Sequence, residues 1–366
     1  MAVPKEPTWE RDPHTAAKHD VLRRYLQAWA PILLSRNDVI TYAEGFAGPG
    51  IYKGGEAGSP VIAHGVLASW LRQRPGKMVK MVLIEEDPRR IAELERRLAH
   101  TRATSLGPEL TRLETLVAQG ACHPDLLHRL GQAGSLQHPM FVLLDGFGGP
   151  DVPFTLIEQI ARHRSSEVMI TFQPQFLIRF ATKDDHHRGS GDAFFGNTDW
   201  QGVFSQPSHA KAPYLRDQYR RTLKRAGFDH SLSFEMIDEK GHLLYLIFGT
   251  RNEKGVEKMK DAMWKVDTTT GVRYRDPKDP RQQVLDLNFE PDTGPLRRIL
   301  LEHLKASPTG RRVEDLQRFT LLETVYKPTQ VISLLTRMRS EHRITATPGR
   351  ITRSTQVTAT HTDALF

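Results

Sequence analysis

A glycine-rich loop from Glu44 to Gly50 is the first place where residue types and spacing suggest chemistry. The loop follows the apolar run Val39–Ala43 and precedes a stretch with helical spacing. Glycine has no Cβ, so a ligand can approach its backbone closely. A glycine-rich turn between a strand and a helix is also the context that a nucleotide-binding loop requires. We expect the loop to cradle a cofactor through Gly45, Phe46, Gly48 and Gly50, with Glu44 near the cofactor's positive charges.

The next two predicted strands end in residues suited to the rest of the same ligand. The apolar run Met78–Ile84 leads directly to Glu85, and a carboxylate at that place can accept hydrogen bonds from both ribose hydroxyls. Gly120 and Ala121 follow the third strand, beside the place expected for the adenine. Many methyltransferases carry an acid there, which this chain lacks. The ordered spacing nevertheless predicts S-adenosylmethionine (SAM) as the cofactor.

Asp145 and Phe147 follow the fourth apolar run, Met140–Leu144. A polar group at this place can accept hydrogen bonds from a target amine and direct its lone pair toward a methyl group. An aromatic ring beside it can stack on a presented base. We therefore expect Asp145 to contact both cofactor and substrate, and Phe147 to hold the substrate. The alternative is structural, with Asp145 in an ordinary strand-to-helix turn and Phe147 capping the edge of the sheet.

A regular alternation of strands and helices must position these residues. Five apolar runs, each followed by helical periodicity, predict five βα units, and two strands over 231–237 and 243–250 predict a β-hairpin. A plain dinucleotide-binding sheet would continue with parallel strands. The predicted fold class is therefore α/β, with a Rossmann-like class I methyltransferase sheet over residues 1–266 that includes an N-terminal helix over 14–36. Residues 181–202 break the rhythm and predict an insertion with few core residues, a mobile cap or loop.

The C-terminal part of the chain has a different pattern. Residues 267–292 are rich in Asp, Pro, Thr and Arg and predict a linker, while 358–366 predicts a tail. Between them, 293–357 contains three stretches with helical periodicity. Ile344–Thr347 and Arg350–Arg353 then predict the two strands of a wing. Three helices and a wing indicate a winged helix-turn-helix domain.

Positive charge is concentrated in the same region. Residues 291–357 contain twelve Lys or Arg and six Asp or Glu, which is +6 of the chain's formal +8. This concentration favours a nucleic-acid partner, double-stranded DNA first, while a winged helix that contacts another protein is the alternative. In the nucleic-acid interpretation, the third helix and the wing would contact bases and backbone through Lys327, Thr329, Gln330, Ser333, Arg337, Arg350 and Arg353.

Composition narrows the class of protein. No run of 18 apolar residues exists, so we expect no transmembrane helix. The first residues lack an apolar signal region, which leads us to expect a cytoplasmic protein. The single cysteine, Cys122, excludes an internal disulfide and a cysteine-based zinc site. No ligand spacing predicts a metal.

A series of short motifs extends in order from residue 14 to about residue 264. They are His14-Thr15-x-x-Lys18-His19 with Leu22 and Tyr25-Leu26, then Gly45–Gly50, Gly58-Ser59-Pro60, Ile84-Glu85, Asp145-Gly146-Phe147-Gly148, Phe195-Gly196 with Trp200, and Met259–Met263. On these motifs the chain resembles the three-Cys-motif partner protein family, which is similar to class I SAM-dependent methyltransferases. The family pattern has Asp-Pro-Phe-Gly where this chain has Asp145-Gly146-Phe147-Gly148, which loosens the turn. The family name implies a partner, a radical-SAM-like protein with a three-cysteine motif.

The resemblance also directs attention to His14 and Lys18. One helical turn separates them, so both side chains can face the same site. Lys18 would bind a phosphate or the substrate, and His14 would act in proton transfer. The alternative is a helix cap and a surface lysine.

Three functions follow as expectations. The first is a SAM-dependent methyltransferase that acts on nucleic acid, DNA first. The second is a DNA-binding partner of the three-cysteine protein with little or no methyl transfer, in DNA repair or phage defence. The third is a metal-dependent nuclease in which His14, Lys18, His186, His187 and acids from the insertion at 181–202 surround a metal.

Overall fold

A computed structural model describes residues 4–104, 107, 111–147, 149–181, 185–237, 241–271, 273–275 and 291–360. The chain divides into two compact units. The N-terminal unit comprises Met1–Ala262 and Arg273–Gln283, and the C-terminal unit comprises Met263–Val272 and Val284–Phe366. Each unit has its own cluster of buried hydrophobic residues. Within the described residues, no helix is long and apolar enough to cross a membrane.

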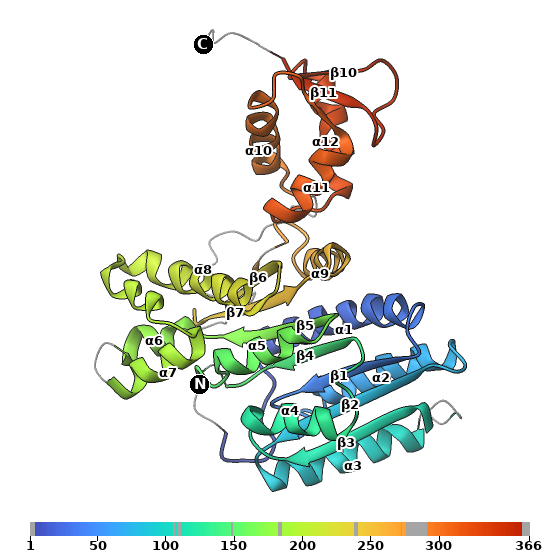
Figure 1. Ribbon diagram of the computed structural model, residues 1–366, viewed down its shortest axis with the longest axis vertical. Helices are drawn as coiled ribbons and strands as arrows, with labels where there is room; N and C mark the ends of the chain where they lie inside the picture. The colour runs from blue at the N-terminus through green and yellow to red at the C-terminus, as the bar shows by residue number, and fades with distance from the viewer. Residues whose placement is uncertain are drawn as a thin grey trace. The chain divides into compact units, whose positions relative to one another are not determined.

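An eight-stranded mixed sheet forms the centre of the N-terminal unit, in the order β3-β2-β1-β4-β5-β7-β6-β8 (Figure 1). Strands β1 to β5 are all parallel to one another, whereas β7 is antiparallel to both β5 and β6. The short β8 is parallel to β6. The strands are β1 (Val39–Glu44), β2 (Met78–Glu85), β3 (Leu113–Gln119), β4 (Met140–Leu144), β5 (Ser166–Phe172), β6 (His230–Ile237), β7 (Leu243–Thr250) and β8 (Arg273–Arg275).

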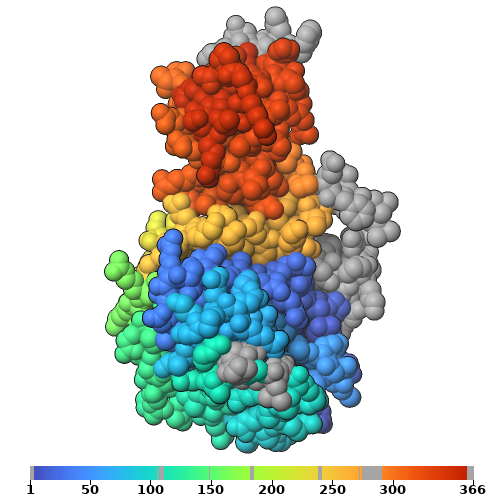
Figure 2. Space-filling view, turned by 90° about the vertical axis from the view of Figure 1, so that its right-hand side faces the viewer, coloured from blue at the N-terminus to red at the C-terminus, as the bar shows by residue number. Residues whose placement is uncertain are grey.

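Helices cover both faces of this sheet, as apolar parallel strands require. Helices α1, α2 and α3 pack in sequence on one face, and α4, α5 and α8 pack in sequence on the other. Figure 2 shows the first face, where atoms coloured blue to cyan lie together. The helices are α1 (Pro13–Leu34), α2 (Ser59–Arg72), α3 (Pro88–Thr104), α4 (Cys122–Gln132), α5 (Phe154–Arg162), α6 (Pro174–Phe180), α7 (Asp185–Phe195), the 3₁₀ helix η2 (Asp199–Ser205), α8 (Ser208–Ala226) and α9 (Glu253–Val266).

This topology confirms the predicted α/β fold with a Rossmann-like sheet closed by an antiparallel hairpin. The order of the strands reverses at β1, which has β2 on one side and β4 on the other. Crevices form beyond the carboxyl ends of parallel strands at such a switch point. Of the turn predicted for the hairpin, residues 238–242, the first three lie outside the described residues.

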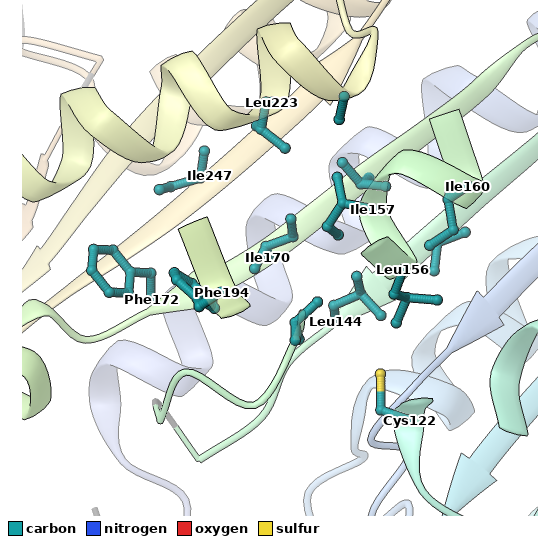
Figure 3. Close-up of a cluster of buried hydrophobic side chains, with 14 of the residues drawn as sticks. Cys122, Leu144, Leu156, Ile157, Ile160, Ile170, Phe172, Phe194, Leu223 and Ile247 are labelled. Carbon is teal, nitrogen blue, oxygen red and sulfur yellow. The ribbon is translucent and has the colours of Figure 1, made fainter. Parts of the chain in front are cut away.

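The expectation that residues 181–202 contribute little to the core is wrong. Ala181 and residues 185–202 are described, and 185–195 form the helix α7. Phe194, Phe195 and Trp200 are at most 1% exposed, and Phe194 lies against Phe172 of β5, with ring centroids 5.3 Å apart (Figure 3). The sequence before these aromatic residues is polar, so it did not predict a helix. The helix that forms there buries only its last turn.

Residues 291–360 of the C-terminal unit form three helices and a three-stranded antiparallel sheet with the order β10-β11-β9. Apolar residues of each helix face one core, and Val331, Leu334, Leu335 and Met338 of α12 are buried in it. The elements are α10 (Gly294–Lys305), β9 (Arg311–Arg312), α11 (Val313–Glu323), α12 (Thr329–Ser340), β10 (Ile344–Ala346) and β11 (Gln356–Ala359).

The predicted second strand of the wing, Arg350–Arg353, is wrong. These residues lie in the connection between β10 and β11, and Gln356–Ala359 pairs with β10 instead. Val357 is fully buried, which fixes the register of β11. The predicted tail at 358–366 therefore begins too early, because Thr358 and Ala359 belong to the sheet. Residues 361–366 lie outside the described part of the chain.

The predicted linker, 267–292, is only partly described. Residue 272 and residues 276–290 lie outside the described part. Arg273–Arg275 form β8, and the Arg273 guanidinium pairs with Glu235 of β6 at 2.6 Å. This part of the segment is thus a sheet strand.

Candidate functional site

A cavity of about 660 Å³ opens where the sheet reverses its order. This volume is in the range of small-molecule and cofactor sites. The cavity is lined by the loops that follow β1, β2, β3 and β4, by the start of α1, and by part of the segment 4–12. We divide it into two parts. The glycine half contains the loop Gly45–Gly50 and Glu85, and the aspartate half contains Asp145, Phe147, His14 and Lys18.

Glycine is required in the loop after β1 for two different reasons. A Cβ on Gly45 would lie 2.5 Å from the sulfur of Cys122, so the close packing of two loops excludes any side chain. Gly48 has φ +62°, a left-handed conformation that glycine adopts without strain. Gly45, Phe46, Gly48 and Gly50 all line the cavity, where the sequence predicted a cofactor cradle.

Glu85 lies at the carboxyl end of β2 and is 6% exposed. Its two oxygens accept hydrogen bonds from the backbone N–H groups of Gly48, at 2.9 Å, and Asp87, at 3.0 Å. The Arg90 guanidinium lies 3.6 Å from the same carboxylate. Glu85 is thus a fixed acceptor in the wall of the glycine half.

Contrary to the prediction, Glu44 does not face the cavity. Its side chain is fully buried, and its oxygens accept hydrogen bonds from the hydroxyls of Tyr42, at 2.6 Å, and Ser59, at 2.7 Å. Burial raises the pKa of this carboxyl to about 8, although the two hydroxyl donors oppose the shift. Ser59, rather than Glu44, lines the cavity. Glu44 is the last residue of β1 and its side chain points into the core. This orientation keeps its carboxyl away from a ligand in the cavity.

The loop after β3 contributes its backbone. Ala121 lines the cavity and Gly120 does not. The Gly120 N–H donates to the Glu85 carbonyl at 3.1 Å, and the Ala121 N–H donates to the Asp125 carboxylate at 2.8 Å. Burial raises the pKa of the neighbouring Cys122 thiol, so this residue stays neutral. None of Gly120, Ala121 and Cys122 supplies the acidic side chain that many methyltransferases have after β3.

A buried ion pair dominates the aspartate half. The Lys18 ammonium of α1 contacts the Asp145 carboxylate, with side-chain exposures of 11% and 13%. His14, one turn earlier on α1, is buried and lines the same cavity. The structure therefore brings together the two residues of the His14–Lys18 motif and the carboxylate after β4. Lys18 is a buried partner of Asp145 and not a solvated surface lysine.

Trp9 closes the cavity from a part of the chain that sequence reasoning did not select. Its ring lies 5.7 Å from that of Phe147 and 5.9 Å from that of Tyr52. The guanidinium of Arg90 lies over both Trp9, at 5.1 Å, and Phe147, at 5.3 Å. Arg90 is 4% exposed, which makes this a buried cation between two aromatic faces.

Backbone contacts hold the segment 4–12 in this place. Arg90 and Arg89 donate to the carbonyls of Pro4, at 2.8 Å, and Lys5, at 3.1 Å. The Lys53 N–H donates to the Trp9 carbonyl at 2.9 Å. A tryptophan and several prolines before the first helix were the only sequence indication, because the partners lie more than 40 residues away.

The predicted nucleic-acid contacts of the C-terminal unit differ in exposure. Thr329, Ser333 and Arg337 are exposed on one face of α12, and Arg350 and Arg353 are exposed before β11. Gln330 instead accepts a hydrogen bond from the Lys327 N–H at 2.8 Å, which ties the first turn of α12 to the residue before its N-cap. Arg337 donates to the Thr293 hydroxyl at 3.2 Å, and Arg353 to the Gln317 side chain at 3.3 Å.

His186 and His187 do not join His14 and Lys18. Both lie on α7 and neither lines the cavity. Across the described residues, no group of three or more His, Cys, Asp or Glu side chains is arranged to hold a metal ion. The geometry thus gives the nuclease alternative no metal site in that part of the chain.

Comparisons with known proteins find likeness in structure only. No family model matches the sequence, and no curated protein matches it. Among solved structures, the chain is similar to Trm1 from Pyrococcus horikoshii, in complex with S-adenosyl-L-methionine. That alignment has a TM-score of 0.38 and 10% identity, and covers 98% of this chain and 95% of that one.

Two other solved structures are also similar. The O-methyltransferase TomG from Streptomyces achromogenes, in complex with SAM, aligns with a TM-score of 0.35 and 15% identity over 67% of this chain and 92% of TomG. EvdMO1 aligns with a TM-score of 0.33 and 13% identity over 64% of this chain, and the aligned part spans 42% of EvdMO1. The ligands and activities in these names belong to those proteins.

Proposed function

We propose that the protein is a SAM-dependent methyltransferase that acts on nucleic acid. The observation that carries the proposal is that Gly48, Glu85 and Asp145, from the loops after β1, β2 and β4, line one cavity. One cavity thus offers both a cradle for the nucleoside of a cofactor and a carboxylate for the acceptor amine of a substrate.

The glycine half fits the cofactor on its own geometry. Gly45 and Gly48 present backbone without side chains, and Glu85 offers fixed carboxylate oxygens to ribose hydroxyls. Ala121 would flank the adenine, and Phe46 and Gly50 would complete the wall. SAM, when bound, supplies an electrophilic methyl group on a sulfonium.

The aspartate half fits the acceptor. The Asp145 carboxylate can accept a hydrogen bond from an amine and orient its lone pair, and Phe147 offers a ring face for a base. Lys18 holds this carboxylate before a substrate arrives. A substrate amine must therefore join or displace the Lys18 ammonium, while His14 is placed to receive the proton that the amine loses.

In this proposal, the C-terminal unit binds the substrate. Three helices and a small antiparallel sheet fit a winged helix. The exposed Thr329, Ser333 and Arg337 of α12, with Arg350 and Arg353, suit contacts to a DNA groove and backbone. The net charge of +6 over 291–357 supports a polyanion.

The Lys18–Asp145 pair favours a second candidate. If substrate does not displace Lys18, the protein binds DNA without transferring a methyl group, and acts as the partner of a three-cysteine radical-SAM-like protein. The resemblance to the three-Cys-motif partner family supports this version. The glycine at position 146, in place of the family's proline, supports it too.

Transfer of labelled methyl groups to a panel of DNA, RNA and peptide separates the two candidates. The first candidate predicts incorporation into nucleic acid that Asp145→Ala reduces by about 100-fold or more. Asp151→Ala is the matched control, because Asp151 lines the same cavity and lies six positions after Asp145 in the connection between β4 and α5. Incorporation that survives Asp145→Ala would refute the role of Asp145. No incorporation, with the cofactor bound, would leave the partner role.

A further inference from the structure

Helix α8 presents a row of positive charge on the N-terminal unit. Its 19 residues contain six Lys or Arg and one acid, Asp217. Arg220, Arg221, Lys224 and Arg225 are exposed. In the described part of the chain, Arg221 and Lys224 have no carboxylate at ion-pair distance. The charge of the molecule is therefore not confined to residues 291–357.

An exposed stack of rings lies on the helices that pack against α8. Phe180, at the end of α6, is 46% exposed, and is one of two exposed large hydrophobic residues among those described. Its ring is stacked on that of His187 of α7, with centroids 5.6 Å apart and planes at 27°, and lies 5.2 Å from that of Phe176. An exposed phenyl ring adds little to folding stability, and its open face is available for stacking.

Packing joins the helices of the stack to the charged helix. Helices α6 and α7 both contact α8, and they lie together in Figure 1. The Tyr219 ring of α8 is stacked on Phe194 of α7 at 4.4 Å, and the Thr222 hydroxyl donates to the Phe195 carbonyl at 3.1 Å. Tyr219 and Thr222 belong to the buried face of α8, whereas Arg221 and Lys224 are exposed, so this packing fixes the orientation of the charged face relative to α7.

Helix α6 connects the stack to the cavity. Gln173, the N-cap of α6, lines the cavity, and Phe180 ends the same helix. A strand that crosses the stack is therefore one short helix away from Asp145. Rings that accept unpaired bases beside cations that accept phosphates are the combination used by proteins that bind single-stranded nucleic acid.

We infer that α6, α7 and the exposed face of α8 bind an unpaired stretch of nucleic acid next to the cavity. The inference rests on the proposed function and adds that the part of the substrate next to the cavity is unpaired, with bases on Phe180 and His187 and phosphates on Arg221 and Lys224. A double helix cannot offer its base faces to this stack. An apolar protein partner would require a larger hydrophobic patch than one phenyl ring.

Fluorescence anisotropy with the full chain tests this assignment, with one labelled oligonucleotide used as a single strand and as a duplex. We expect Phe180→Ala to weaken single-strand binding by about fivefold or more, and Phe180→Tyr to restore it. Arg221→Glu with Lys224→Glu should weaken it by about tenfold or more and flatten the salt dependence. The matched control is Arg23→Glu with Arg36→Glu, the same charge change at two exposed positions of the α1 region.

Three outcomes would overturn the assignment. Single-strand binding that survives both α6 and α8 variants contradicts it and leaves the proposed function standing. Equal losses for single strand and duplex contradict the stacking of unpaired bases. If no oligonucleotide binds the unmodified chain, both the assignment and the nucleic-acid substrate fail. Binding of S-adenosylhomocysteine, measured for each variant, reports whether the N-terminal unit is folded.

Discussion

The two halves of the cavity are built differently. In the glycine half, backbone groups and one carboxylate meet through contacts between adjacent parallel strands, such as the 2.9 Å bond from Gly48 to Glu85. In the aspartate half, a buried ion pair joins α1 to the loop after β4, and Trp9 reaches Phe147 from before α1. The sheet fixes the first half, while side chains distant in sequence form the second. Cofactor binding should therefore depend on the backbone conformation of the glycine half. The chemistry of the acceptor should depend on the charges of the aspartate half.

The largest effect is expected in the glycine half. Gly48→Arg places a long side chain in the cavity at φ +62°, and should weaken binding of S-adenosylhomocysteine by about 100-fold or more. Equilibrium dialysis measures the change. Gly55→Arg is the control, because Gly55 also has a positive φ, +91°, with open space around its Cβ position. Equal losses in the two variants would contradict the role of Gly48.

The ion pair of the aspartate half predicts a loss of stability. Lys18→Met leaves a nearly buried Asp145 carboxylate without its partner and should lower the free energy of unfolding by about 2–4 kcal/mol. Adding Asp145→Asn should recover part of that loss, because the uncompensated charge is removed. Urea denaturation of the single and double variants gives the coupling free energy. Additive effects would mean that the two side chains do not interact.

Glu44 predicts a pH dependence of stability. Its folded pKa, about 8, is above its ordinary value of 4.5. The stability that this group contributes is fully present below its ordinary pKa and is lost as the pH rises through about 8. Between about pH 5 and pH 9 the loss should be on the order of 2–5 kcal/mol. Glu44→Gln should flatten the curve, and an unchanged slope would show that the Glu44 carboxyl ionises normally.

Trp9 predicts the smallest effect and joins the two halves. Trp9→Ala removes a ring that lies over the glycine loop and against Phe147, and should raise the dissociation constant of S-adenosylhomocysteine by about 5- to 20-fold. Isothermal titration measures the change. Trp70→Ala, in α2 and outside the cavity, is the matched control. An unchanged affinity in Trp9→Ala would limit the segment 4–12 to a structural role.

The same contrast explains what the sequence could predict. The strands, the glycine loop and Glu85 were predictable because apolar periodicity and strand ends are local patterns. Arg90, Trp9 and the Lys18–Asp145 contact depend on residues more than 80 positions apart, which no local pattern reports. Glu44 was misplaced because the face on which the last residue of a strand projects is decided by packing. Phe194 and Trp200 were missed because a polar run masks the helix that buries them.

The central claim is that this cavity binds SAM, and calorimetric titration of the full chain with S-adenosylhomocysteine tests it most directly. Titration at two temperatures is needed, because binding changes the heat capacity and its enthalpy therefore varies with temperature. At the one temperature where this enthalpy is zero, binding would release no heat. The account predicts saturable binding of one ligand per chain with a dissociation constant on the order of micromolar, which Gly48→Arg removes. No heat at either temperature, with either S-adenosylhomocysteine or SAM, would contradict it.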